Sequence, residues 1–140
     1  LGYRKFDLHP DEIITSVRIP IVHDTLKLYK VSRRKDLDIS AFTAAIRLTI
    51  NAERIDRAMI AYGGVAPTVI RLPRTEAFLT GKAPTLDTFE HAGRIARDEI
   101  KPISDVRGSA DYRLQLAENI MAKFWYEVFG ETSARRFARA

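Results

Sequence analysis

The chain has 140 residues and a formal net charge of +5, with 46% hydrophobic and 29% charged residues, a composition that is typical of a folded domain and excludes a disordered chain. It lacks cysteine, which excludes disulfides and any thiolate ligation of a metal or an iron–sulfur cluster by this chain. No stretch approaches the ~20 apolar residues that cross a bilayer and no signal segment begins the sequence, so we expect a cytoplasmic protein without membrane contact.

The two ends of the chain differ from its middle. The first residue is Leu1 rather than methionine, which indicates a piece of a longer protein. Arg135, Arg136 and Arg139 crowd the last six residues and supply part of the positive charge. We therefore divide the chain into one domain over residues 1–130 and a basic tail over residues 131–140. We interpret the tail as a frayed surface segment rather than an arm that binds nucleic acid.

The first alternating segment, residues 11–19, ends at Pro20 and predicts a β-strand. In such a strand, Ile14 shares a face with Ser16 and Arg18 and is the apolar member of that face. Two interpretations of Ile14 stay open. It either makes an edge contact with a neighbouring loop or forms a platform for a flat ligand.

Further strands follow at shorter intervals. Residues 26–31 predict a short strand, and residues 42–50 show the clearest alternation of apolar and polar side chains in the chain. Residues 51–54 suit a turn, after which residues 55–62 return as a strand that ends at Gly63-Gly64. The last two strands therefore predict an antiparallel hairpin.

Three helices are predicted after the strands, where the apolar period changes to 3.6. The first runs over residues 73–79, and the second is capped by Thr85 or Asp87 and stopped by Pro102. Ser109 can cap the third, which ends at Gly130. Strands followed by helices are typical of the α+β class. We expect a small antiparallel sheet of three to four strands, followed by three helices packed on one face.

The segment between the second and third predicted strands, residues 29–41, is unusually charged. Residues 30–39 contain four cations and two carboxylates. A tight turn needs no such charges, whereas loops held by a rigid scaffold often carry binding sites. Two interpretations of this segment stay open: a run of solvent-exposed charges, or a binding site.

Motifs for self-contained catalysis are missing from the sequence. His9, His23 and His91 lack the spacing of metal ligands, and there is no P-loop, G-x-G-x-x-G or G-x-S-x-G motif. The pattern therefore predicts a domain that binds something or supports a site shared with other domains. A basic, non-enzymatic interaction or nucleic-acid-binding module is one alternative, although aromatic residues are not interleaved with the basic ones.

Several groups of residues, taken with their order and spacing, resemble one family. The groups are Gly2–Lys5, Glu12–Pro20, Tyr29–Arg34 with Asp38–Ala41, Ala61–Gly64, and Asp105–Ala110 with Tyr112-Arg113. Together they resemble the C-terminal domain of molybdenum hydroxylase flavoprotein subunits, as in CO dehydrogenase flavoprotein, and especially that of the FAD-binding small subunits of bacterial xanthine dehydrogenases. The resemblance runs from Gly2 to about Glu127 and implies the fold predicted above.

The resemblance implies that the chain is one part of a larger oxidoreductase. FAD-binding and 2Fe–2S domains would precede it in the same subunit, and a large subunit would hold the molybdenum cofactor. In xanthine dehydrogenases, electrons from the purine pass through iron–sulfur clusters to FAD and then to NAD. The implied role of this domain is to cover the flavin, without a catalytic residue or metal ligand of its own and without activity in isolation. The flavin subunit of another molybdenum hydroxylase, oxidising an aldehyde, an N-heterocycle or CO, is the alternative within this class.

The resemblance also implies four residues that contact the cofactor. Ile14 falls where the family presents a strand residue to the flavin ring. Lys30, or its neighbour Tyr29, falls at the flavin-contacting lysine, and since adjacent strand residues face opposite sides, both cannot contact the ring in the same way. Asp36 falls in the loop that lies over the flavin near the nicotinamide, where a carboxylate disfavours the reduced, anionic flavin.

Overall fold

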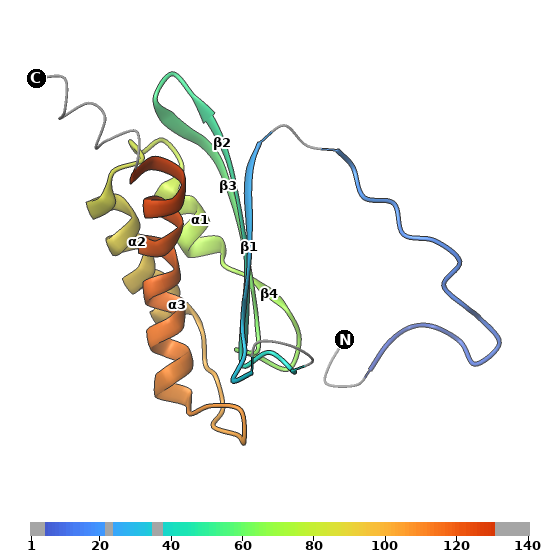
Figure 1. Cartoon of the computed structure of the whole chain (residues 1–140). Helices are drawn as coiled ribbons and strands as arrows, with labels where there is room; N and C mark the ends of the chain where they lie inside the picture. Colours follow the sequence, from blue (N-terminus) through green and yellow to red (C-terminus); the bar gives the residue numbers. More distant parts are fainter. Residues whose placement is uncertain (1–4, 22–23, 35–37, 131–140) are drawn as a thin grey trace, which may run out of the picture.

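The computed structural model describes residues 5–21, 24–34 and 38–130 and consists of a sheet layer and a helix layer (Figure 1). The antiparallel sheet has four strands in the order β1-β2-β3-β4, and three helices cover one of its faces. The elements are β1 (Thr25–Val31), β2 (Phe42–Asn51), β3 (Arg54–Gly63), β4 (Ile70–Arg71), α1 (Pro73–Leu79), α2 (Leu86–Glu99), α3 (Ala110–Trp125) and a π-helical turn (Tyr126–Gly130). The predicted α+β arrangement is confirmed. The predicted basic tail, residues 131–140, lies outside the described residues.

The β2–β3 hairpin forms the centre of the sheet, as its alternating sequence predicts. Every second residue of β2 from Phe42 to Leu48 is buried beneath the helices. In the connecting turn, Ala52 and Glu53 have φ angles of 45° and 60°. Positive φ at both central residues is the geometry of a type I′ turn, whose twist matches that of the strands it joins.

The predicted strand over residues 11–19 is wrong. Residues 5–21 loop out away from the sheet, on the side opposite the helices, and form no strand (Figure 1). Ile13, Ile14 and Val17 are 82%, 73% and 77% exposed. Alternation identifies an extended segment suited to half-burial, but a strand also needs a neighbouring strand to accept its hydrogen bonds. The part of the chain that the structure describes supplies none for this segment.

The two edges of the sheet differ in what pairs with them. On the β3 side, the short β4 pairs with Ala61 and Tyr62, and the Ile60 amide donates to Glu76 Oε1 at 2.7 Å. The Ile55 amide on the same edge donates to the Lys82 carbonyl at 2.9 Å. On the other side, β1 pairs with β2 alone among the described residues. One edge is therefore closed by α1 and its flanking loops, and the other is open.

The helices begin where the sequence predicts. The hydroxyls of Thr85 and Ser109 accept hydrogen bonds from the amides three residues further on, at 3.2 and 3.1 Å, which caps α2 and α3. Helix α1 has no side-chain cap of its own. The Glu99 carboxylate at the end of α2 instead accepts from the Arg74 and Thr75 amides at 2.8 and 3.0 Å. The start of α1 therefore depends on the end of α2.

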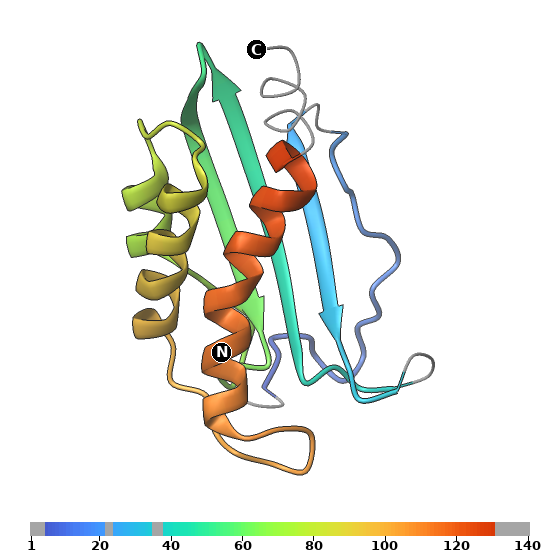
Figure 2. The same ribbon diagram turned by 60° about the vertical axis from the view of Figure 1, so that its left-hand side comes forward.

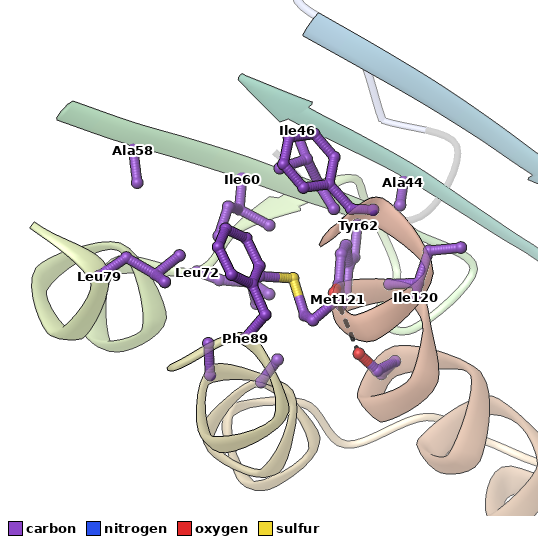
Figure 3. Close-up of a cluster of buried hydrophobic side chains, with 14 of the residues drawn as sticks. Ala44, Ile46, Ala58, Ile60, Tyr62, Leu72, Leu79, Phe89, Ile120 and Met121 are labelled. Atoms are coloured by element: carbon purple, nitrogen blue, oxygen red, sulfur yellow. Dashed lines mark hydrogen bonds between the residues drawn. The ribbon is translucent and has the colours of Figure 1, made fainter. Parts of the chain in front are cut away.

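A single hydrophobic core lies between the sheet and the helices (Figure 3). Tyr62 is fully buried in it, and its hydroxyl donates to the Ala117 carbonyl in α3 at 3.0 Å. Helices α2 and α3 cross closely at Gly93, where an added Cβ would lie 2.4 Å from the Glu118 carbonyl oxygen. This packing fixes the helix layer on one face of the sheet and leaves the opposite face uncovered by helices.

Candidate functional site

The face of the sheet opposite the helices is not covered by a helix (Figure 1). Two neighbouring rows of this face, at the end near the charged loop, are Leu28–Ala45–Ala61 and Lys30–Thr43–Gly63, and the row beyond them is Leu26–Arg47–Met59. Residues paired across antiparallel strands lie on the same face, so the six residues of the first two rows form one surface, called here the open face. Leu28 is 73% exposed and Lys30 is exposed, both on β1. Because the other four side chains are small, this surface fits one side of a flat ring.

The register separates the two candidates on β1. Tyr29 points towards the helices, where its hydroxyl donates to Glu127 Oε2 at 3.0 Å and its ring packs against the core. Burial, followed by the hydrogen bond to Glu127, raises the pKa of the Tyr29 phenol. Lys30 points to the open face. Of the two residues, only Lys30 is available to a ligand on that face.

The charged loop after β1 is held at both of its described ends. The Arg34 amide donates to Asp38 Oδ2 at 2.8 Å, and this hydrogen bond holds the pKa of the Asp38 carboxyl below its usual range. The Arg33 guanidinium donates to the Val106 carbonyl at 3.0 Å. Asp36, the predicted carboxylate near the nicotinamide, lies outside the described residues. The described charges of this loop therefore organise the loop itself and tie it to the loop before α3.

Three segments that carried the family resemblance meet at one end of the molecule. Figure 2 shows the β1–β2 loop and the loop preceding α3 at the same end. Gly64, with φ of +79°, packs on the charged loop, since a Cβ there would lie 2.6 Å from the Ala41 carbonyl oxygen. Ser109 caps α3, which confirms the prediction that it marks a helix entry. The motif residues therefore make the contacts that hold these loops together.

Arg113 is a site residue that sequence reasoning did not single out beyond its place in a motif. It is only 3% exposed, and its guanidinium donates to the Ile103 carbonyl and to Asp105 Oδ1 at 2.7 and 2.6 Å. A hydrogen bond from the Arg107 amide, with the Arg113 charge, keeps the pKa of the Asp105 carboxyl below its usual range. One signal was available: Arg113 falls four residues before Ala117, on the buried stripe of α3.

The comparisons with known proteins identify the family. The family model of the CO dehydrogenase flavoprotein C-terminal domain matches residues 27–128. The chain belongs to this family. Within the described residues of this flavoprotein domain, no group of three His, Cys, Asp or Glu side chains is placed to hold a metal ion. None of the described helices is long and apolar enough to cross a membrane.

Individual relatives of the flavoprotein domain are enzymes of one broad class. The chain is 36% identical over 140 residues to a xanthine dehydrogenase of Emericella nidulans, covering 96% of the chain and 10% of that protein. It is 26% identical to the glyceraldehyde dehydrogenase medium chain of Sulfolobus acidocaldarius, covering 87% of the chain and 43% of the relative. The solved structure of quinoline 2-oxidoreductase from Pseudomonas putida 86 superposes with a TM-score of 0.70 at 32% identity, covering 78% of the chain and 38% of that structure.

These matches confirm the resemblance inferred from the motifs: the chain is a C-terminal domain of the molybdenum hydroxylase FAD subunits. It spans about a tenth of the length of the xanthine dehydrogenase relative and less than half of the other two. Tyr29 and Lys30 lie inside the segment matched by the family model, whereas Ile14 lies before it, in the exposed segment 5–21. Of the three predicted cofactor contacts within the described residues, Lys30 belongs to the open face.

Proposed function

We propose that the chain is the C-terminal domain of the FAD subunit of a cytoplasmic xanthine dehydrogenase. In this proposal it covers the flavin that passes electrons from the molybdenum and 2Fe–2S centres to NAD. Its partners are the preceding FAD and iron–sulfur domains of the same subunit and the molybdenum-binding large subunit. The observation that carries the role is the open face, where Ala45, Ala61, Thr43 and Gly63 lie beside two exposed β1 residues, Leu28 and Lys30. Family membership and the fungal relative support the enzyme class.

Lys30 is the residue to which we assign an electrostatic role. A flavin becomes more negative when it is reduced, and a cation fixed beside it stabilises that charge. Lys30 stands at the β1 end of a row completed by Thr43 and Gly63, so its ammonium group can reach the edge of a ring laid on the open face. Tyr29 is engaged by Glu127 on the other side of the sheet, which favours Lys30 over Tyr29.

Ile14 and Asp36 complete the proposed contacts. Ile14 is 73% exposed in a segment on the same side of the sheet as the open face (Figure 1), so an apolar contact with the flavin ring is compatible with its position. Asp36 belongs to the charged loop, which is tied to the same end of the sheet through Arg33. Its carboxylate opposes Lys30, because a negative charge disfavours the reduced, anionic flavin.

The test is the flavin potential of the assembled enzyme carrying Lys30→Ala. A hydrogen bond to a charged group contributes about 1.5–3 kcal/mol, so its loss lowers the two-electron potential by about 30–60 mV. The reduction of molybdenum by the oxidised substrate stays near the wild-type rate, because Lys30 lies on the flavin domain. The matched control is Lys27→Ala, on the same strand but on the helix side. An unchanged potential in Lys30→Ala removes this residue from the flavin site.

The alternative is a molybdenum hydroxylase that oxidises another substrate. Glyceraldehyde dehydrogenase and quinoline 2-oxidoreductase are among the relatives, so the fold of this domain is shared by enzymes named for an aldehyde and an N-heterocycle. Turnover of xanthine by the complete enzyme, compared with aldehydes and N-heterocycles, discriminates between them. Selective turnover of an aldehyde would refute the xanthine assignment while leaving the role of Lys30 to be judged by the potential.

A further inference from the structure

A cavity of about 510 Å³ lies at the end of the domain where the loops meet. It is lined by the loop between β1 and β2, the loop after β3, the loop between α2 and α3, and the first turn of α3. Ala66, Pro67 and Ile103 give it apolar walls. Its volume lies within the range of about 300–1,000 Å³ that is usual for small-molecule sites.

Arg113 lines this cavity with an unsatisfied donor. Its side chain is 3% exposed, and its two terminal nitrogens donate to Ile103 and Asp105. Its Nε–H has no hydrogen-bond partner among the described residues. A buried donor without an acceptor lowers stability, and this cost is greater when the donor is charged. Nε itself is closed to solvent, so an acceptor in the cavity meets this donor when the Arg113 side chain shifts towards it.

The charges around the cavity are also unbalanced. Lys101, Arg107 and Arg113 supply three positive charges, and Asp105 supplies one negative charge. Asp105 Oδ1 already accepts from both Arg113 and the Arg107 amide. The Arg107 side chain is 45% exposed, and its Nε lies 3.9 Å from Asp105 Oδ2, beyond hydrogen-bond distance. Lys101 is exposed and forms no described ion pair. Lys101 is therefore free to turn towards an anion beside Arg113, and Arg107 is held only by its long ion pair with Asp105.

We propose that this cavity binds a small organic oxyanion, a phosphate or carboxylate carried on a flat apolar body. The anionic oxygens accept from Arg107 and Lys101 and, once its side chain shifts to present Nε, from Arg113, because guanidinium groups match the geometry of both kinds of oxyanion. The apolar body packs between Ala66, Pro67 and Ile103. None of the six residues of the open face lines this cavity, although Ser40 of the charged loop does.

The direct measurement is NMR of the ¹⁵N-labelled 140-residue chain, following the Nε–H resonance of Arg113 at constant ionic strength. Phenyl phosphate and benzoate are titrated separately, to distinguish phosphate from carboxylate. Inorganic phosphate tests the need for the apolar body, and phenol tests the need for the charge. We expect a saturable shift of this resonance with at least one of the two aromatic anions, weaker binding of inorganic phosphate, and no shift with phenol.

Exposed variants assign the site without disturbing the buried arginine. Lys101→Gln and Arg107→Gln should each weaken binding about tenfold, in line with the loss of one charged hydrogen bond. Arg94→Gln, which removes an exposed cation from α2, is the charge-matched control and should leave binding unchanged. The proposal is overturned if neither aromatic anion shifts the Arg113 resonance, if phenol binds as well as they do, or if Arg94→Gln weakens binding as much as Lys101→Gln. The NMR titrations use the chain without flavin. Their outcomes are therefore separate from the flavin potential measured in the Lys30→Ala enzyme.

Discussion

Adjacent residues of the same strands build the two faces of the sheet, yet the faces differ in cover and in composition. On β2, Ile46 is fully buried under the helices, whereas its neighbour Ala45 belongs to the open face. On β1, the Tyr29 hydroxyl donates a hydrogen bond to Glu127 on the helix side, whereas Lys30 is exposed on the other side. Buried side chains on the covered face supply the stability of the domain, whereas on the open face the small residues of β2 and β3 beside Leu28 and Lys30 leave room for a partner. The contrast teaches that stability and binding can be changed separately along one strand.

The largest expected effect is on the covered face. Ile46→Ala removes a fully buried side chain and should lower the free energy of unfolding by about 2–5 kcal/mol. Leu28→Ala, on the open face, should change it by less than about 0.5 kcal/mol, because the side chain is already 73% exposed. Urea unfolding of both variants measures the difference. A similar loss in Leu28→Ala would mean that the open face is packed.

The same Leu28→Ala variant should show its effect when the preceding FAD domain is present. If the open face covers the flavin, Leu28 becomes buried in the assembled subunit, and burial of a leucine side chain contributes about 1.5–3 kcal/mol. We expect FAD to be bound about tenfold more weakly, measured by fluorescence of the released flavin on dilution. Arg94→Ala on α2 is the control and should retain FAD like the wild type. Equal retention by Leu28→Ala would separate the open face from the flavin.

A smaller effect, on the stability of the fold at low pH, should come from the ion pair between Asp24 and Arg47. Arg47 Nε donates to Asp24 Oδ2 at 2.6 Å and holds the pKa of Asp24 below its ordinary value of 3.8. A depressed folded-state pKa stabilises the fold above the unfolded-state pKa, and this contribution is lost as the pH falls through the folded-state value. The drop in urea midpoint between about pH 6 and about pH 2.5 should therefore be smaller in Asp24→Asn than in the wild type.

Arg47→Gln tests whether the arginine causes that shift. Removing the guanidinium returns the Asp24 pKa towards its ordinary value and should reduce the pH dependence in the same direction as Asp24→Asn. A wild-type pH dependence in both variants would show that the Asp24–Arg47 pair does not contribute to acid sensitivity.

Much of the fold followed from local pattern. The alternation of residues 42–50 and 55–62 predicted β2 and β3, and hydroxyls at Thr85 and Ser109 marked the starts of α2 and α3. These features depend on neighbouring residues alone, so a single sequence contains them. The short β4 was not predicted, because two residues are too few to display a period.

The remaining differences depend on contacts between distant residues. Alternation in residues 11–19 could not show whether a neighbouring strand exists, and in the described structure it does not. The strand predicted over residues 26–31 placed Tyr29 and Lys30 on opposite faces, but only the position of α3 in the structure shows which face is covered. Arg113 was missed for the same reason, since its acceptors belong to Ile103 and Asp105 in a separate loop. The contact of Ile14, Lys30 and Asp36 with the cofactor stays a prediction.

The open edge of β1 has a consequence for handling the isolated chain. An unpaired strand edge is a template on which another chain can add a strand, and exposed apolar side chains such as Leu26 and Leu28 make such addition favourable. Lys27 and Lys30 lie on the same strand as these leucines, and two such positively charged edges repel each other at low ionic strength. Self-association of the purified chain should therefore increase with salt concentration.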